Sequence, residues 1–150
     1  MSDSSPAPFA AVLVVRRTIR ARPEALFAAW TDPQQLTRWW GPPGVTCTAA
    51  EIDLRVGGSY RIANRMPDGS TLWIAGEFEL IEPPSRLIYS WRLEIPEAGT
   101  ERVSVSFVPR DATTEVIVTH ERIASETART RHEIGWIGCL DGLTRFAEGA

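Results

Sequence analysis

One segment decides the fold of this chain: residues 125–148, which read SETARTRHEIGWIGCLDGLTRFAE. Ser125 is a favourable N-cap, because its hydroxyl can accept a hydrogen bond from the first turn of a helix. The apolar residues that follow recur close to the 3.6-residue period of an α-helix. We therefore predict one long helix from Glu126 to about Glu148, with an apolar stripe that another element must cover: Ile134, Trp136, Ile137, Leu140, Leu143 and Phe146.

Three glycines interrupt this helix, at Gly135, Gly138 and Gly142. Each costs about 1 kcal/mol relative to alanine in a helix interior. Repeated small residues on a helix that lies against a sheet indicate either a close approach of another segment or room left for a ligand. The sequence leaves both interpretations open.

The segments before this helix read as β-strands separated by short turns. Alternation of apolar and polar residues gives the predicted sheet one apolar face, which the terminal helix can cover. Short connections between successive strands predict an antiparallel meander. Strands are expected at 11–20, about 46–54, 59–65, 72–81, 87–95, 102–108 and 115–121. On the strand after Thr71 the apolar face is expected to hold Leu72, Ile74, Gly76, Phe78 and Leu80.

Two short helices are predicted directly after the first strand. Pro23 suits the first position of one helix. Asp32 can cap the next helix, where Gln35 completes a capping-box pattern, and Gly41 with the two prolines after it ends that helix. The order of elements predicts an α+β fold in which a curved antiparallel sheet wraps a long C-terminal helix.

Composition limits the classes of function. The chain has 150 residues, of which 43% are hydrophobic, and we expect one domain over residues 12–148 after a disordered tail at residues 1–9. A net charge of −3 without runs of like charge argues against a nucleic-acid surface or membrane insertion. Cys47 and Cys139 lack metal-site spacing, so no metal or cofactor is expected. Without a signal-like segment, the expected location is cytoplasmic.

Several motifs resemble one known family. They include Trp30-Thr31-Asp32-Pro33, Trp39-Trp40-Gly41-Pro42, the run from Glu51 to Arg61, and Gly135-Trp136 with Cys139-Leu140-Asp141. Together they are similar to the START-like (SRPBCC) superfamily, in the branch homologous to the C-terminal domain of the activator of the heat-shock protein 90 ATPase. The resemblance implies a helix-grip (Bet v 1-like) fold with a ligand cavity between sheet and helix. The activator also uses an additional N-terminal domain that this sequence does not match, so chaperone stimulation is not implied.

The inward faces supply the candidate cavity residues. His120 falls on an apolar strand face, where a polar ring needs a partner or a ligand; a backbone carbonyl or water would also satisfy it. His132 can face the cavity or solvent, and plain core packing is an alternative for each aromatic residue. The predicted ligand-binding residues are Trp39, Tyr60, Ile74, Phe78, Tyr89, Trp91, Phe107, His120, His132, Trp136, Cys139 and Leu140.

Three functions remain open at this level. The first is binding of a hydrophobic small molecule of unknown identity. The second is a cyclase or hydrolase in which His120 or His132 acts as general base, although no nucleophile elbow, phosphate loop or metal cluster is present, which argues against an enzyme. The third is a module that interacts with a chaperone. Either a monomer or a homodimer is compatible with the sequence.

Overall fold

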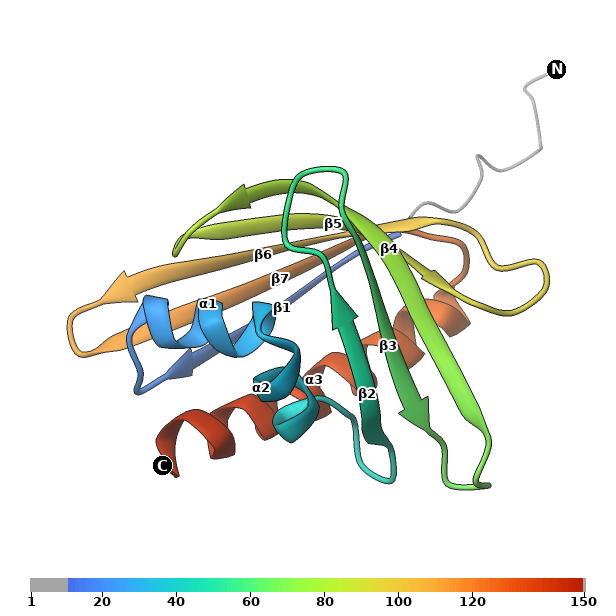
Figure 1. Ribbon diagram of the computed structural model, residues 1–150, viewed down its shortest axis with the longest axis horizontal. Coiled ribbons are helices and arrows are strands. Elements are labelled where there is room, and N and C mark those ends of the chain that lie inside the picture. Colours follow the sequence, from blue (N-terminus) through green and yellow to red (C-terminus); the bar gives the residue numbers. More distant parts are fainter. Residues whose placement is uncertain (1–10, 150) are drawn as a thin grey trace, which may run out of the picture.

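The structure, a computed structural model, describes residues 11–149 and contains seven strands and three helices in that range (Figure 1). The tail expected at residues 1–9 lies outside the described residues. The elements are β1 (Ala11–Ile19), α1 (Pro23–Thr31), α2 (Pro33–Trp39), β2 (Thr46–Ile52), β3 (Ser59–Arg65), β4 (Thr71–Glu82), β5 (Arg86–Leu93), β6 (Glu101–Arg110), β7 (Thr113–Ile123) and α3 (Glu126–Glu148).

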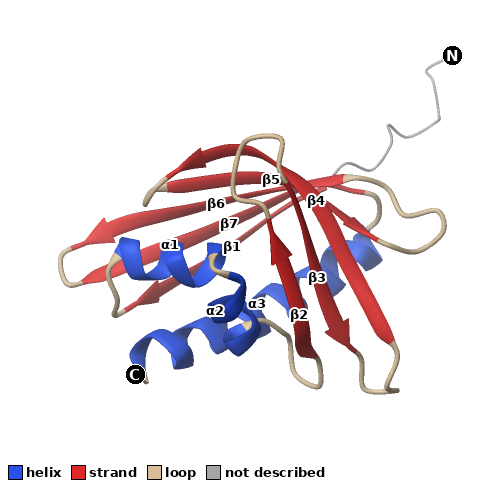
Figure 2. Cartoon of the chain, viewed as in Figure 1, coloured by secondary structure: helices blue, strands red, loops and turns tan. Residues whose placement is uncertain are grey.

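The strands form one antiparallel sheet in the order β1-β7-β6-β5-β4-β3-β2. Strands β2 to β7 make the predicted meander, and β1 pairs with β7. Helices α1 and α2 carry the chain from β1 at one edge to β2 at the other, and α3 lies across the concave side of the sheet (Figure 2). This arrangement confirms the helix-grip architecture.

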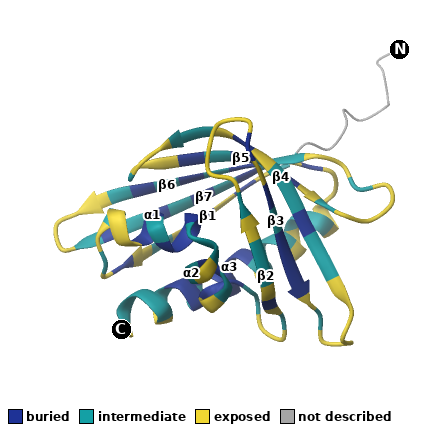
Figure 3. Cartoon of the chain, viewed as in Figure 1, coloured by how far each residue is buried: buried dark blue, intermediate teal, exposed yellow. Residues whose placement is uncertain are grey.

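Helix α3 begins as predicted, because the Ser125 side chain accepts a hydrogen bond from the backbone of Ala128 at 3.1 Å. The predicted apolar stripe is wrong at two positions. Ile134 is 61% exposed and Ile137 is 43% exposed, whereas Trp136, Cys139, Leu140 and Leu143 are buried. The helix is rotated so that Gly138 and Gly142, rather than these isoleucines, face the rest of the protein. Figure 3 shows that α3 has both buried and exposed parts.

The glycines of α3 have different surroundings. A methyl group added at Gly142 would collide with the backbone oxygen of Trp39, and one added at Gly138 would lie 2.7 Å from Pro42. These two positions therefore permit close approach. A methyl group at Gly135 would meet no atom within 4 Å, so this position borders open space.

The junction of α1 and α2 differs from the predicted capping box. Asp32 caps α2 by accepting from the backbone of Gln34 at 3.0 Å. In a capping box the Gln35 side chain would accept from the backbone N–H of Asp32, but that group donates to Ala28 and closes α1. The Gln35 amide instead donates to the Asp32 carboxylate at 3.1 Å.

A bulge in β4 changes which side chain faces the core. The register with β5 shifts between Phe78 and Leu80, so Leu80 pairs with the outward Ile88. Ile81, opposite the buried Leu87, packs against the core in its place. Leu80 was predicted to face inward, and this is wrong because simple alternation assumes an unbroken register.

Ion pairs hold α3 along the edge strand. Arg17 of β1 contacts Asp141 at 2.7 Å, and Arg20 contacts Glu148 at 3.2 Å. Further along, Arg129 donates to the backbone oxygen of Val12. These contacts keep the helix in place above the sheet. Within the described part of the chain, each helix is too short or too polar to cross a membrane.

Candidate functional site

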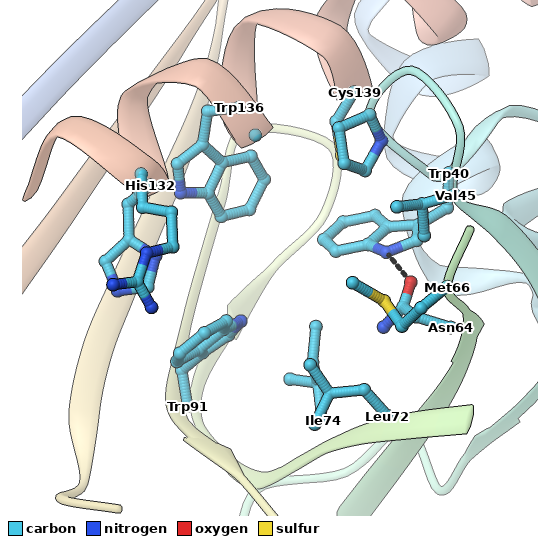
Figure 4. Close-up of a pocket in the computed structure, with 13 residues that line it drawn as sticks. Trp40, Val45, Asn64, Met66, Leu72, Ile74, Trp91, His132, Trp136 and Cys139 are labelled. Atoms are coloured by element: carbon cyan, nitrogen blue, oxygen red, sulfur yellow. Dashed lines mark hydrogen bonds between the residues drawn. The ribbon is translucent and has the colours of Figure 1, made fainter. Parts of the chain in front are cut away.

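A cavity of about 140 Å³ lies between α3 and strands β3, β4 and β5 (Figure 4). Its walls are mostly apolar, and residues of both the sheet and the helix contribute to them. The segment after α2 closes one end, and Gly135 leaves space on the helix side. The lining residues are Trp40, Pro42, Val45, Asn64, Met66, Leu72, Ile74, Trp91, Arg131, His132, Gly135, Trp136 and Cys139.

Three indole rings frame this cavity. Trp40 and Trp136 meet edge to face with ring centroids 5.4 Å apart. The indole N–H of Trp40 donates to the Asn64 side chain at 3.0 Å, and that of Trp136 donates to Nδ1 of His120 at 3.0 Å. Trp91, on β5, is buried, and its Nε1 has no hydrogen-bond partner among the described residues.

A polar cluster lies behind one wall of the cavity. Oε1 of Glu101 is 2.6 Å from Nε2 of His120 and 3.1 Å from Nε2 of His132. The two imidazole rings are stacked, with centroids 4.4 Å apart, and Trp91 contacts both rings edge to face. Three elements build the cluster: β6 supplies the carboxylate, β7 supplies His120 and α3 supplies His132.

The partner of Trp136 determines the tautomer of His120. An indole N–H can only donate, so Nδ1 of a neutral His120 must accept and Nε2 must carry the proton. This proton points at Glu101. Burial lowers the pKa of His120 below its usual 6.5 and outweighs the opposing hydrogen bond with Glu101. His120 is therefore neutral at neutral pH, with both ring nitrogens engaged.

Glu101 remains ionised within this cluster. Burial acts to raise the pKa of its carboxyl group, but hydrogen bonds from His120 and His132 lower the pKa to about 2. The carboxylate thus accepts from both rings and fixes their positions. His132, held in this way, forms part of the cavity wall.

The same three residues have the composition of a metal site, with donor atoms within 4.8 Å of one another. Their arrangement does not fit one. The Nε2 atom of His120 carries a proton, because Nδ1 accepts from Trp136. The two rings are also within 16° of parallel, so their in-plane lone pairs do not converge on one point. The cluster is a hydrogen-bond network.

The structure separates the predicted site residues into groups. Ile74, Trp91, His132, Trp136 and Cys139 line the cavity, and His120 lies behind it. Tyr60, Phe78 and Tyr89 border a separate void of about 20 Å³, which also touches Trp91. Trp39, Phe107 and Leu140 are buried in the core and line neither space.

Specific contacts explain why part of the predicted cavity is filled. The Trp30 indole donates to the Tyr89 hydroxyl at 3.2 Å, and the Tyr60 hydroxyl donates to the backbone of Ser90 at 2.7 Å. Phe107 packs edge to face against Phe27 and Trp30. The Trp39 indole donates to the backbone of Ala29 at 2.9 Å. Ligand contact by any of these residues stays a prediction.

Several site residues were not among those predicted: Glu101, Asn64, Met66 and Arg131 line the cavity or its cluster. Glu101 could have been found. It lies two residues before the buried Val103, on the same face of β6, and pairs with Trp91. Because the predicted strand began at Arg102, Glu101 was left in the preceding loop.

Larger hollows lie at the surface, and charged residues border them, unlike the mostly apolar cavity beneath α3. One of about 500 Å³ runs between the start of α1 and the β6–β7 turn, where Arg22, Glu24 and Asp111 border it. Another of about 630 Å³ lies beside Arg38 and Arg145 at the end of α3. Neither lies between the sheet and the middle of α3, where the aromatic walls are.

Comparisons with known proteins bear on the family and the fold of the chain. Residues 20–148 match the family described as Activator of Hsp90 ATPase homolog 1-like protein. A solved protein of Chromobacterium violaceum is similar, with a TM-score of 0.85 and 24% identity over 91% of this chain and 96% of that one. The AHSA1 protein of Silicibacter pomeroyi has a TM-score of 0.80 and 26% identity over 89% and 95%. A search of curated proteins gives no match.

A more distant likeness extends over one part of a larger protein. DynU16, a protein from the dynemicin biosynthetic locus, is 19% identical with a TM-score of 0.76. The likeness covers 91% of this chain and 47% of DynU16. At this identity it shows a shared fold.

Proposed function

Since the chain belongs to the family of activator of Hsp90 ATPase homolog 1-like proteins, in the START-like superfamily, we propose that it binds a small, largely apolar molecule in the cavity beneath α3. The fold is of a ligand-binding type. What carries the proposal is one observation: the interior holds a cavity of about 140 Å³ between Trp40, Trp91 and Trp136, whereas the neighbouring void beside Tyr60 measures only about 20 Å³.

The size of the cavity limits the ligand. Drug-sized ligands occupy sites of about 300–1,000 Å³. The cavity measures about 140 Å³, which is close to the apolar cavities of about 150 Å³ that take up benzene. The proposed ligand therefore has roughly one ring.

A histidine-based cyclase or hydrolase is not favoured. Both ring nitrogens of His120 have partners, and the carboxylate beside it already accepts from two donors. Burial also raises the pKa of the Cys139 thiol to about 12, so this cavity residue is not a ready nucleophile. A chaperone-binding role has no observation of its own to favour it.

The test measures thermal stability with one-ring hydrocarbons. A ligand that binds only the native state raises the melting temperature by mass action, so toluene should stabilise the wild-type protein. Gly135→Leu places a side chain in the open space and should abolish this stabilisation. Ile134→Leu, an exposed change one residue away, is the matched control and should preserve it. Equal stabilisation of wild type and Gly135→Leu would refute binding at this site.

A further inference from the structure

We propose that the ligand is a neutral one-ring carbonyl compound whose oxygen accepts a hydrogen bond from Nε1 of Trp91. This inference rests on the function proposed above and adds the chemical class of the ligand. It begins with a buried donor that the protein itself leaves without an acceptor.

Trp91 differs from the other buried tryptophans. Trp30 donates to a tyrosine hydroxyl, Trp39 to a backbone carbonyl, Trp40 to an asparagine side chain and Trp136 to a histidine nitrogen. Trp91 is 8% exposed, and within residues 11–149 its Nε1 is the one buried side-chain nitrogen or oxygen without a partner. Leaving such a donor unpaired costs about 1–3 kcal/mol, so an acceptor supplied from outside the chain would recover free energy.

The position of this donor is suitable for a ligand. Trp91 lines the cavity, and Figure 4 shows its ring nitrogen on the side that faces the open space between Trp136 and Ile74. The surrounding walls are aromatic and aliphatic. A molecule that fits must therefore be mostly apolar and must place one hydrogen-bond acceptor near Trp91, because an indole N–H only donates.

The charges around the cavity favour a neutral acceptor over an anion. The rings of His120 and His132 lie 5.0 and 4.9 Å from the Trp91 ring, and both contact the ionised Glu101. A ligand carboxylate near Trp91 would approach this negative charge in a poorly solvated interior, which is unfavourable. The cation that lines the cavity, Arg131, is solvent-exposed, so its attraction is screened. A ketone, aldehyde or ester can accept a hydrogen bond from Nε1 of Trp91 without repulsion from the Glu101 carboxylate.

The experiment compares two probes of the same shape. Acetophenone carries a carbonyl oxygen where α-methylstyrene carries a methylene group, so the pair differs in one acceptor. Calorimetry gives the dissociation constants of both for wild type and for Trp91→Phe, which keeps an aromatic ring but lacks the donor. We expect the preference for acetophenone over α-methylstyrene to fall about tenfold in Trp91→Phe, the effect of one lost hydrogen bond. Binding of α-methylstyrene should change little.

A second measurement follows probe binding by the wild-type protein alone, so Trp91→Phe does not have to bind either probe. The indole N–H signal of Trp91, assigned in proton–nitrogen NMR spectra by its loss in Trp91→Phe, should move downfield with acetophenone and less with α-methylstyrene. An unchanged preference in Trp91→Phe, with both probes bound, would overturn the carbonyl inference and leave the cavity function standing. Tighter binding of benzoate than of acetophenone would also overturn it, in favour of an anion. If neither neutral probe binds, the proposed function itself fails.

Discussion

At the scale of single residues, Trp136 orders the cluster behind the cavity. Its donor-only indole holds His120 in the tautomer that donates to Glu101. We predict that imidazole NMR of the wild-type protein shows the Nε2–H tautomer of His120. In Trp136→Phe the other tautomer should gain population, and the free energy of unfolding should fall by about 1–3 kcal/mol because a buried nitrogen loses its partner. An Nδ1–H tautomer in the wild type would contradict this reading.

Glu101 makes stability depend on acidity. Its folded-state pKa of about 2 lies below the usual 4.5, so its ionised form stabilises the fold above about pH 4.5 and this contribution is lost as the pH falls toward 2. The lowered pKa of His120 acts in the same direction below pH 6.5, because the unfolded chain takes up that proton first.

This dependence gives a prediction for Glu101→Gln. Urea unfolding should show a smaller loss of stability between pH 5 and pH 2.5 in this variant than in wild type. Glu79→Gln removes a carboxylate of an exposed ion pair with Arg102 and is the matched control; it should keep the wild-type acid dependence. A full acid dependence in Glu101→Gln would show that Glu101 is not its source.

The sequence allowed part of this residue-scale picture to be predicted. The strand alternation correctly predicted that His120 is buried, since a period of two determines the face. A longer predicted β6 would have placed Glu101 on the inward face, but its contact with His120, and that of Trp136, could not be predicted because these residues come from β6 and α3. Contacts between distant segments depend on strand register and helix rotation, which a local pattern leaves undetermined.

At the scale of elements, α3 combines close packing and open space within two turns. Gly142 faces the backbone of Trp39, whereas Gly135 faces no atom within 4 Å. We predict opposite effects of the same substitution. Gly135→Ala should stabilise the fold by up to about 1 kcal/mol through helix propensity. Gly142→Ala should destabilise it by about 1–3 kcal/mol, because the added methyl group forces the helix away from α2.

Chemical denaturation of the two glycine variants checks this pair, with the wild type as reference. Gly135→Ala also serves as the control for helix propensity alone. Stabilisation by Gly142→Ala would contradict the close approach of α3 to Trp39.

The boundaries of α3 could be predicted well, and its rotation could not. The Ser125 cap and the end of α3 are local signals, and the structure confirms them. The apolar period predicted burial of Ile134 and Ile137, but the close approach of Pro42 and Trp39 at the glycines turns the helix and exposes both. The β4 bulge could not be predicted for a similar reason. Pairing with β5, rather than the β4 sequence alone, places Ile81 instead of Leu80 on the core face.

At the scale of the whole molecule, the cavity arises from the way the chain closes around α3. The two short helices bring the segment after Trp39 against the terminal helix, while β3, β4 and β5 form the opposite wall. The family resemblance predicted where such a space would lie. Its size could not be predicted, because aromatic side chains such as Tyr60, Phe78 and Tyr89 fill one part, and Gly135 leaves the other part open.

The central claim is that a small molecule occupies the space between Trp40, Trp91 and Trp136. A crystal structure of the protein grown with acetophenone tests it most directly. We predict density for one ring in the cavity, with the carbonyl oxygen within hydrogen-bond distance of Nε1 of Trp91. Density for the probe only in the surface hollows, or side chains that close the cavity completely, would contradict the claim.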